Sequence, residues 1–563
     1  MRLKGVIRKV SSMLADRIKE IIAGSLVVVT VVLFYQVFNN QKELAQSIAT
    51  YGVKIKHTAG EAPYAGDSVS AHTLTQQTWA LVQEKACDTV VQVIAQTAET
   101  NILQPYRTPK QSGGAGTAFF ISEEGELITN AHVVDEAQAV WIKIPALGKM
   151  IIDVEVIGRT PERDLALLKV TPEGLAKIKE KLVTIPFLPL GNSDLVRRVD
   201  EVLTLGYPLG QGSLKSTCGV VSGREHIGGR LLIQIDSPIN PGNSGGPALN
   251  MLGQVIGITC SGIQAAQNVG YIIPINELKM ILDDLRKTPL LRRPFLGFFL
   301  NNGSEELAKH LNNPVPAGCY IVDVYENSPL AKNGIKPGDM IYEINGIPVD
   351  EYGDLALSWS EDKLTLMDYI SMLELGQQVT LVCYRNGSRK EVSFPFEKTE
   401  LAPVRQIFLG NDTIDYEIYG GMLLQPLTLN HVPPLVSNAP ILTRYGSSKH
   451  QKEPVLILTH IIPNSQTQRL SLLAEGAIIS EVNGVAVKTM EDLRHAIGQN
   501  IKKERMTFKT EDGVFFVLNT KKVLEDEAKL SQTYQYPISP FMKQMIEQGL
   551  PKAQVVPNVQ KGA

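Results

Sequence analysis

The sequence is poor in cysteine, and this scarcity excludes several classes of protein. The 563 residues hold five cysteines, at positions 87, 218, 260, 319 and 383. They form no C-x-x-C pair and no metal-ligand spacing, so neither a disulfide-stapled fold nor a zinc or other metal site is predicted. The odd count leaves at least one thiol unpaired within a monomer. We expect most of the cysteines to be small buried residues.

An excess of basic residues is also missing. Lys and Arg number 55 against 58 Asp and Glu, which gives a formal net charge of -3 at pH 7. A general nucleic-acid binder needs positive charge to displace counterions, so no nucleic-acid partner is expected. The hydrophobic fraction of 44% is ordinary for globular protein. The length exceeds what one core supports and predicts about three or four domains.

One long hydrophobic run stands near the N-terminus. Residues 1–20 hold six Lys and Arg residues against two Asp and Glu residues, and residues 21–38 follow without a charged side chain. As a helix this run would be about 27 Å long, close to the hydrocarbon thickness of a bilayer. The alternative is a cleaved signal peptide, but its apolar core is usually only about 7 to 15 residues. We therefore expect a transmembrane helix, with the basic segment in the cytoplasm and the rest of the chain outside.

The chain is organised around a serine between glycines. Ser244 lies within the run Gly-Asn-Ser-Gly-Gly-Pro at 242–247, between two short β-type runs. A serine hydroxyl needs a base to take its proton and donors to hold the oxyanion that its attack creates. The glycines would let the N–H groups of Gly242, Asn243 and Ser244 point into one oxyanion hole. Taken alone, a glycine-rich turn that happens to contain serine is an equally good interpretation.

Two upstream residues supply the missing partners. His132 ends an apolar strand, and Asp164 comes directly before another. Separately, such a histidine is usually a packed core residue and such an aspartate a turn former. The order His132, Asp164, Ser244 is one of the three chain orders in which Ser-His-Asp triads occur. We therefore predict that Ser244 attacks a carbonyl, that His132 takes and returns the proton, and that Asp164 orients the imidazole, with no cofactor.

These stretches resemble the catalytic blocks of the Deg (HtrA) family of ATP-independent serine proteases. The similar segments are residues 129–134, 164–170, 205–210, 219–223, 242–247 and 270–275. The resemblance implies a chymotrypsin-like double β-barrel over about residues 86 to 290, with the triad across the cleft between the barrels. It places Ile239, Ile258 and Gly262 around the pocket for the residue before the cut. No acidic residue lies there, which favours small or medium aliphatic residues in substrates; the family also implies a homotrimer or a multiple of trimers.

The second half resembles the PDZ domains attached to Deg proteases. A first domain is expected at 294–398, with an insertion near 354–368. The resemblance gives it a carboxylate-binding loop formed by Phe295, Leu296, Gly297 and Phe298. PDZ domains bind a peptide by adding it as a strand to the edge of a sheet, while loop N–H groups hold its terminal carboxylate.

An internal repeat predicts a second PDZ-like domain. Residues 341–349 match residues 479–487, and each stretch is followed by an Asp-Leu pair, at Asp354 and at Asp492. A chance strand-turn-strand match is the alternative. No convincing carboxylate-binding loop is visible in the second copy, so we expect it to be structural rather than peptide-binding.

The predicted fold is mainly β: a chymotrypsin-like double β-barrel and two PDZ-like α+β domains behind an N-terminal transmembrane helix. The expected segments are a cytoplasmic basic segment at 1–20, a transmembrane helix at 21–38, a spacer at 39–75, a protease domain at 76–290, PDZ domains at 294–398 and 454–524, an inter-domain segment at 399–453 and a polar tail at 525–563.

The predicted function is a membrane-anchored, ATP-independent serine endopeptidase that cleaves misfolded or PDZ-recognised proteins outside the cytoplasm. Its partners would be unfolded proteins and peptide C-termini, and in a bacterium the catalytic domain would face the periplasm from the inner membrane. A chaperone or scaffold with an inert protease fold is one alternative, and the intact triad weighs against it. A regulatory protease with one membrane substrate is another, and the sequence does not choose between it and general quality control.

Overall fold

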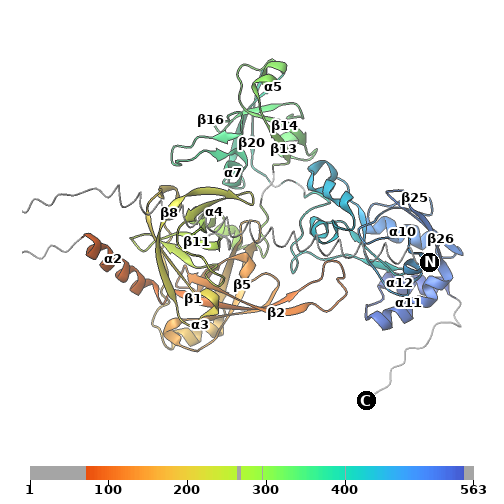
Figure 1. Ribbon diagram of the computed structural model, residues 1–563, viewed down its shortest axis with the longest axis horizontal. Helices are drawn as coiled ribbons and strands as arrows, with labels where there is room; N and C mark the ends of the chain where they lie inside the picture. Colours follow the sequence, from red (N-terminus) through yellow and green to blue (C-terminus); the bar gives the residue numbers. More distant parts are fainter. Residues whose placement is uncertain (1–70, 263–267, 294–295, 398, 400, 551–563) are drawn as a thin grey trace, which may run out of the picture. The chain divides into compact units, whose positions relative to one another are not determined.

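The computed structural model describes residues 71–262, 268–293, 296–397, 399 and 401–550, and Figure 1 shows them coloured along the chain. The transmembrane helix predicted at 21–38 and nearly all of the spacer lie outside these residues. Among the described helices, none is both long and apolar enough to span a bilayer.

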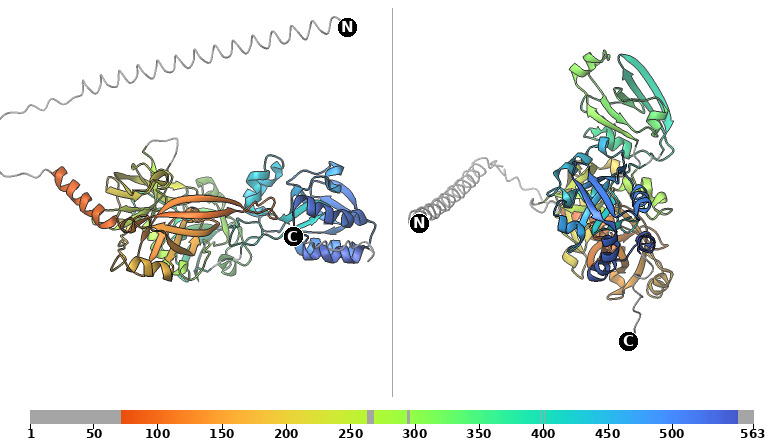
Figure 2. Two further views of the ribbon diagram at one scale, coloured as in Figure 1. Left: turned by 90° about the horizontal axis from the view of Figure 1, so that it is seen from below. Right: turned by 90° about the vertical axis from the view of Figure 1, so that its right-hand side faces the viewer.

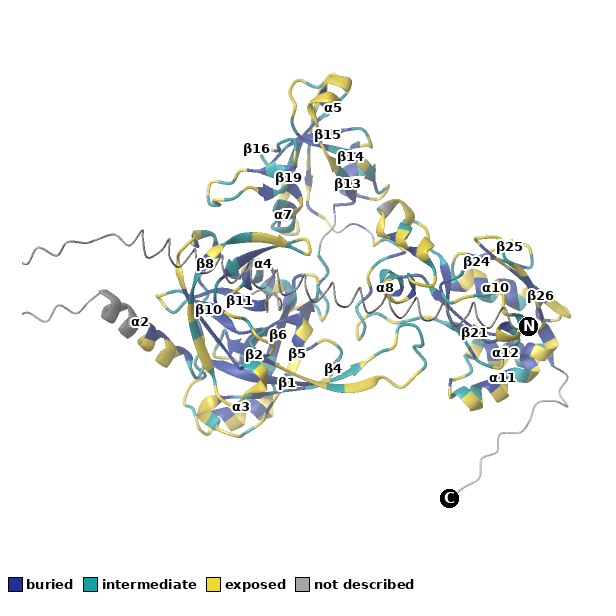
Figure 3. Ribbon diagram, viewed as in Figure 1, coloured by how far each residue is buried: buried dark blue, intermediate teal, exposed yellow. Residues whose placement is uncertain are grey.

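The first half of the protease domain is a closed barrel of strands in the order β1-β2-β3-β6-β5-β4. Its strands are β1 (Val90–Glu99), β2 (Lys110–Phe120), β3 (Glu126–Thr129), β4 (Ala137–Lys143), β5 (Ile152–Thr160) and β6 (Leu165–Val170). Inward-facing side chains such as Phe120, Leu127 and Ile142 are wholly buried and fill the barrel. β1 and β2 form a long hairpin, drawn in orange in Figures 1 and 2, whose outer residues on β2 are mostly exposed (Figure 3).

The second half is another closed barrel, in the order β10-β11-β12-β9-β8-β7. Its strands are β7 (Glu201–Gly206), β8 (Lys215–Ile227), β9 (Arg230–Ile235), β10 (Pro247–Leu249), β11 (Val255–Gly262) and β12 (Gly270–Pro274). Three helices belong to the same domain, α2 (Ala71–Ala86), α3 (Pro172–Lys179) and α4 (Ile275–Leu285). The two barrels confirm the predicted double β-barrel, and α4 directly follows its last strand, β12.

The first PDZ domain is built on a sheet in the order β13-β14-β15-β19-β20, which leaves β13 at an edge. Its elements are β13 (Phe298–Asn302), α5 (Glu305–His310), β14 (Cys319–Val324), α6 (Pro329–Lys332), β15 (Met340–Ile344), β16 (Ile347–Pro348), β17 (Asp354–Leu355), β18 (Leu364–Thr365), α7 (Leu366–Ser371), β19 (Gln378–Arg385) and β20 (Ser388–Pro395). β16 pairs with β15, and β17 pairs with β18 as a separate hairpin.

The second PDZ domain repeats this sheet with one strand added, in the order β21-β22-β23-β24-β26-β27. Its elements are β21 (Glu417–Tyr419), β22 (Met422–Pro426), α8 (Val432–Leu435), β23 (Leu456–Ile461), α9 (Gln466–Leu470), β24 (Ile478–Val482), β25 (Val485–Ala486), α10 (Met490–Asn500), β26 (Arg505–Thr510), β27 (Phe515–Asn519), α11 (Thr520–Tyr534) and α12 (Pro540–Gly549). The sheet therefore begins inside the segment that was expected to separate the two domains.

The internal repeat is present in the structure, but the acidic residue of the first copy that corresponds to Asp492 is not the predicted one. The β15–β16 and β24–β25 turns both hold an asparagine in the left-handed conformation, Asn345 at φ 51° and Asn483 at φ 50°. Asp492 closes a capping box at the start of α10, and in the first copy Asp368 does so at the start of α7. Asp368, and not Asp354, is therefore the counterpart of Asp492, because the β17–β18 hairpin delays the helix.

The expected polar tail is wrong up to residue 549. Helices α11 and α12 bury Leu524, Met542 and Met545 in the core of the second PDZ domain. Their apolar residues recur at helical spacing between polar ones, so the segment reads as polar in composition while presenting one apolar face.

Most cysteines are buried, as expected for small apolar residues. Cys260, Cys319 and Cys383 are buried, and none of the five cysteines is in a disulfide. The described residues hold no group of three or more His, Cys, Asp or Glu side chains arranged to bind a metal ion.

Candidate active site

His132 projects from the first barrel into solvent. It lies on a single 3₁₀ turn, η1 (Ala131–Val133), which follows β3 directly. Ala131 and Val133 are buried, whereas the side chain of His132 is 51% exposed. The turn therefore anchors its apolar residues in the barrel and directs the imidazole outward, which does not fit a packed core histidine.

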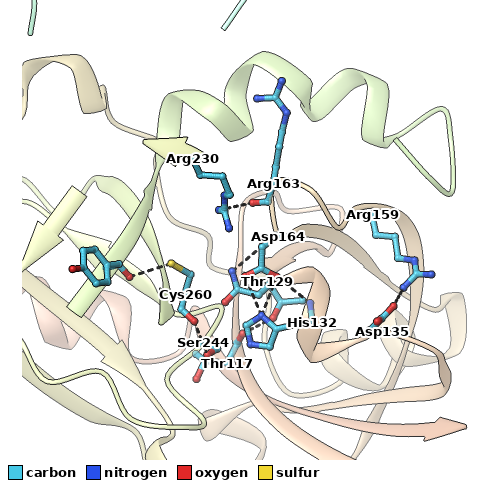
Figure 4. A network of polar contacts seen from close by, with 12 residues as sticks. Thr117, Thr129, His132, Asp135, Arg159, Arg163, Asp164, Arg230, Ser244 and Cys260 are labelled. Carbon is cyan, nitrogen blue, oxygen red and sulfur yellow. Dashed lines mark hydrogen bonds and ion pairs between the residues drawn. The ribbon is translucent and has the colours of Figure 1, made fainter. Parts of the chain in front are cut away.

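Asp164 fixes the orientation of that imidazole (Figure 4). His132 Nδ1 lies 2.9 Å from Asp164 Oδ1 and 3.0 Å from Oδ2, and the backbone N–H of His132 donates to Oδ1 at 3.0 Å. Asp164 itself is left-handed, at φ 54°, and its carbonyl accepts a hydrogen bond from the side-chain amide of Asn130. A carboxylate at Nδ1 keeps the proton on that nitrogen, which leaves Nε2 free to act as a base.

Ser244 lies in the loop between β9 and β10 of the second barrel. Its hydroxyl donates to the carbonyl oxygen of Cys260 at 3.2 Å. Ser244 and His132 line the same cleft, which has a volume of about 640 Å³. In the described part of the chain the serine hydroxyl has no other hydrogen bond, so an attack assisted by His132 requires the hydroxyl to turn toward the imidazole, as is common in unliganded active sites.

The loop before Ser244 differs from the expected oxyanion hole in one amide. The N–H of Asn243 donates to Asn240 O at 3.0 Å and is therefore not available. The N–H groups of Gly242 and Ser244 have no acceptor among the described residues. Gly242 is at φ +99°, and a Cβ there would lie 2.3 Å from Tyr207 O, so this position requires glycine. Two amides rather than three remain for an oxyanion.

Thr117, which the sequence reasoning did not single out, joins the serine loop to the first barrel. This wholly buried residue of β2 donates through its hydroxyl to Gly242 O at 2.7 Å and through its N–H to Ser244 O at 2.9 Å. Its carbonyl accepts the hydroxyl of Thr129 at 2.7 Å. The sequence signal for these contacts is a threonine within a glycine-rich strand, because a hydroxyl group that becomes buried needs hydrogen-bond partners.

The three residues predicted to form the substrate pocket lie in three different environments. Ile239 lines the cleft, together with Gly242 and Ser244. Ile258 is wholly buried in the core and pairs with Pro247 and Ile273 in the sheet, so its side chain does not face the cleft. Gly262 ends β11, next to residues 263–267, which are outside the described structure.

A buried arginine lies behind the triad. Arg163, the residue before Asp164, donates to Ser371 O at 2.8 Å and lies 3.9 Å from Glu277. Arg230 donates to the carbonyl of Arg163 at 2.7 Å. Burial lowers the pKa of the Arg163 guanidinium and raises the pKa of the Glu277 carboxyl. The backbone beside Asp164 is thus held by groups from outside the first barrel.

In the first PDZ domain, the predicted carboxylate-binding loop leads into the free edge strand β13. Leu296 and Phe298 are buried, and Gly297 is at φ +80° with its carbonyl accepting the N–H of Tyr325 at 2.7 Å. A Cβ at Gly297 would lie 2.4 Å from the Cβ of Ser328. Phe295 lies outside the described residues.

The second PDZ domain has an equivalent glycine that the sequence reasoning missed. Gly421 is at φ +88°, directly before β22, and a Cβ there would lie 2.0 Å from the Cβ of Ser465. Ser465 caps α9 just as Ser328 caps α6. Here, however, the strand edge is occupied, because β21 pairs along β22 from Glu417 to Tyr419.

β21 is held firmly in that position. Tyr419 is wholly buried in the core that includes Leu493 of α10. Glu417 accepts a hydrogen bond from Arg494 of α10 at 3.1 Å. A strand from the same chain thus lies where an added peptide strand would pair in the second PDZ domain.

Family models match three stretches of the chain. A trypsin-like peptidase domain matches residues 116–258, and PDZ domains match residues 294–395 and 407–539. The last match covers much of the expected inter-domain segment, in agreement with the position of β21 and β22.

Curated relatives are bacterial proteins named probable periplasmic serine endoprotease DegP-like. The one from Pseudomonas putida (strain GB-1) is 31% identical over 312 residues, covering 52% of this chain and 59% of the relative. The one from Brucella suis biovar 1 is 29% identical over 389 residues, covering 68% of each. The chain thus spans less than two thirds of the length of the Pseudomonas relative.

Among solved structures, the HtrA-type protease AlgW with decapeptide matches at 26% identity with a TM-score of 0.46, covering 57% of this chain and 99% of that one. The sequence motifs, the double barrel and the family matches agree that the chain combines a trypsin-like peptidase domain with two PDZ domains. The chain is therefore a relative of the Deg (HtrA) serine proteases.

Proposed function

We propose that this protein is a serine endopeptidase that uses His132, Asp164 and Ser244 as its catalytic triad. The observation that carries the proposal is the close contact of His132 Nδ1 with both oxygens of Asp164, on a histidine that shares a cleft with Ser244. The curated relatives are named serine endoproteases, which supports the same reaction class.

In the proposed reaction, Ser244 Oγ attacks the carbonyl carbon of a substrate peptide bond while His132 Nε2 takes the hydroxyl proton. The N–H groups of Gly242 and Ser244 then stabilise the oxyanion, and Asp164 stabilises the imidazolium. His132 returns the proton to the leaving amine, and the C–N bond breaks to give an ester on Ser244. A water molecule, deprotonated by His132, hydrolyses the ester and restores the serine.

The cellular setting is proposed from the sequence and the relatives. The run at 21–38 would anchor the chain in the inner membrane, and the name of the relatives suggests a protease domain facing the periplasm. Misfolded proteins are the proposed substrates, and a trimer or a multiple of trimers is the proposed assembly. The rival is a chaperone or scaffold with an inert protease fold.

Digestion of casein by the purified protein distinguishes a protease from a chaperone or scaffold with an inert protease fold. We expect casein to be cleaved without ATP, and cleavage to be blocked by a serine-directed phosphonate and unaffected by EDTA, because the proposed mechanism uses neither nucleotide nor metal. Intact casein after prolonged incubation with folded protein would favour the scaffold.

We further propose that peptide C-termini bind to the first PDZ domain and not to the second. Among the described residues of the two PDZ sheets, β13 has a free edge beside the proposed carboxylate-binding loop, whereas β21 covers the corresponding edge of β22. An added strand needs unpaired backbone groups, which an occupied edge does not provide.

Calorimetric titration of the Ser244→Ala protein with an apolar peptide should therefore give one site per chain. Binding should be lost with an amidated peptide and with Gly297→Ala, whose new Cβ would clash with Ser328. Gly346→Ala is the matched control, since Gly346 has a similar φ of +77° but open space around it. Two sites per chain, or full binding by Gly297→Ala, would refute the assignment.

A further inference from the structure

We infer that the active-site cleft selects basic residues, Lys or Arg, among the first three substrate residues after the cut, and that Glu99 is a specificity-determining residue. This inference rests on the proposed protease function and adds a substrate property that the triad does not set. The two walls of the cleft differ in charge, and the inference rests on this difference.

One wall belongs to the second barrel, and the described residues that form it carry no charge. Ile239 and residues 240–242 form it, beside Ser244. The proposed pocket for the residue before the cut lies on this side, so the acyl half of a substrate lies over the second barrel. The leaving half must then pass His132, which gives its proton to the leaving amine.

The opposite wall, beyond His132, is acidic. Glu99 at the end of β1 and the pair Asp135 and Glu136 after η1 all line it. Among the described residues that line this cleft there is no Lys or Arg. A substrate residue on the leaving side of the cut therefore lies near negatively charged side chains.

The loop carrying two of these carboxylates is fixed rather than loosely placed. Glu136 is left-handed at φ 49°; its carbonyl accepts the N–H of Ala98 and its carboxylate accepts the N–H of Thr100 at 2.8 Å. These bonds tie the loop to the end of β1, close in sequence to Glu99. The three carboxylates are thus presented by one connected piece of structure.

Nearby cations cancel only part of this charge. Arg159 pairs with Asp135, but it is buried and its remaining hydrogen bonds go to Asn411 and to Leu409 O. Lys110 stands opposite Glu99 in the β1–β2 register, yet it does not line the cleft and forms no ion pair in the described structure. Glu99 and Glu136 therefore have no cationic partner among the residues that the structure describes.

Of Glu99 and Glu136, Glu99 allows the clearer test. Its side chain is exposed, and its carboxylate accepts the hydroxyl of Ser112 at 2.9 Å, a bond that a glutamine oxygen can also accept. Glu99→Gln therefore removes the charge and keeps the local contact. Exposed ion pairs are weak, so we expect about a tenfold preference for a basic over an acidic residue and a loss of about threefold of it in the variant.

The experiment uses a cleavage site mapped in casein and peptides that differ only in the three residues after the cut, with Lys or with Glu. We expect the Lys peptide to be cleaved faster by kcat/KM, and the ratio to fall in Glu99→Gln but not in the control Glu155→Gln, which alters an exposed glutamate of β5 outside the cleft. The ratio should also shrink as ionic strength rises from about 0.01 to about 1 M, which shortens the screening length from about 30 to about 3 Å.

Two outcomes would overturn the inference, and a third would overturn the proposed function beneath it. Equal rates for both peptides would show that the acidic wall does not select, and a preference that persists in Glu99→Gln would take the role from Glu99. Failure to cleave casein and every peptide would instead refute the protease function on which the inference rests, so the two failures are distinguishable.

Discussion

Replacing Ser244 with alanine is expected to lower peptide hydrolysis by about 10⁶-fold, the usual cost of losing a triad nucleophile. The hydroxyl is the proposed attacking group. The other hydroxyls that line the described cleft belong to Thr97 and Ser112, which bond to each other and, for Ser112, to Glu99 rather than to His132. The fold should be unaffected, because within the described structure the side chain makes one hydrogen bond, to Cys260 O, whereas the bond from Thr117 N–H to Ser244 O is made by the backbone.

Turnover of a quenched peptide and thermal unfolding should be measured together on the variant. His132→Ala should cost nearly as much as Ser244→Ala, and Asp164→Ala somewhat less, about 10⁴-fold. Ser213→Ala, at an exposed serine of the same domain, is the matched control and should retain full activity. A purified Ser244→Ala protein that keeps most of its activity would eliminate the triad assignment.

The second large effect is expected for Gly242→Ala, which should lower kcat by about 10²- to 10³-fold, the cost of losing an oxyanion-hole donor. At φ +99° an alanine is strained, and its Cβ would lie 2.3 Å from Tyr207 O. The backbone must move to relieve this contact, and the N–H groups of Gly242 and Ser244 would lose their common direction. The oxyanion forms only during the reaction, so KM should change much less than kcat.

Gly212→Ala provides the control for this variant. Gly212 is exposed, has no positive φ and has open space where a Cβ would be, so its substitution should leave kcat unchanged. Thermal unfolding of both variants would show whether the loop change is local. Wild-type kcat in a folded Gly242→Ala protein would mean that the oxyanion is stabilised elsewhere.

The catalytic motifs could be predicted from the sequence because each depends on a few neighbouring residues. A strand followed by a turn fixes His132, and a residue placed just before a strand fixes Asp164. The contacts of Thr117 could not be predicted in the same way. The bonds to Gly242 and Ser244 join residues more than one hundred positions apart, and only the packing of one barrel on the other brings them together.

Other differences have equally local causes. Ile258 was expected in the pocket, but its place on β11 turns its side chain into the core. The second PDZ domain was recognised from its turn, yet its occupied edge was not, because β21 is only a short strand before a Gly-Gly turn. Its last two helices were read as a polar tail, since their apolar residues are spaced apart along the sequence.

The most direct test of the central claim is to find where the serine-directed phosphonate that blocks casein digestion is attached. Peptide mass mapping of the inhibited protein should show one adduct, on Ser244, and His132→Ala should abolish its formation because the hydroxyl then has no base. An adduct on another residue, or inhibition of digestion without any modification of Ser244, would contradict the account.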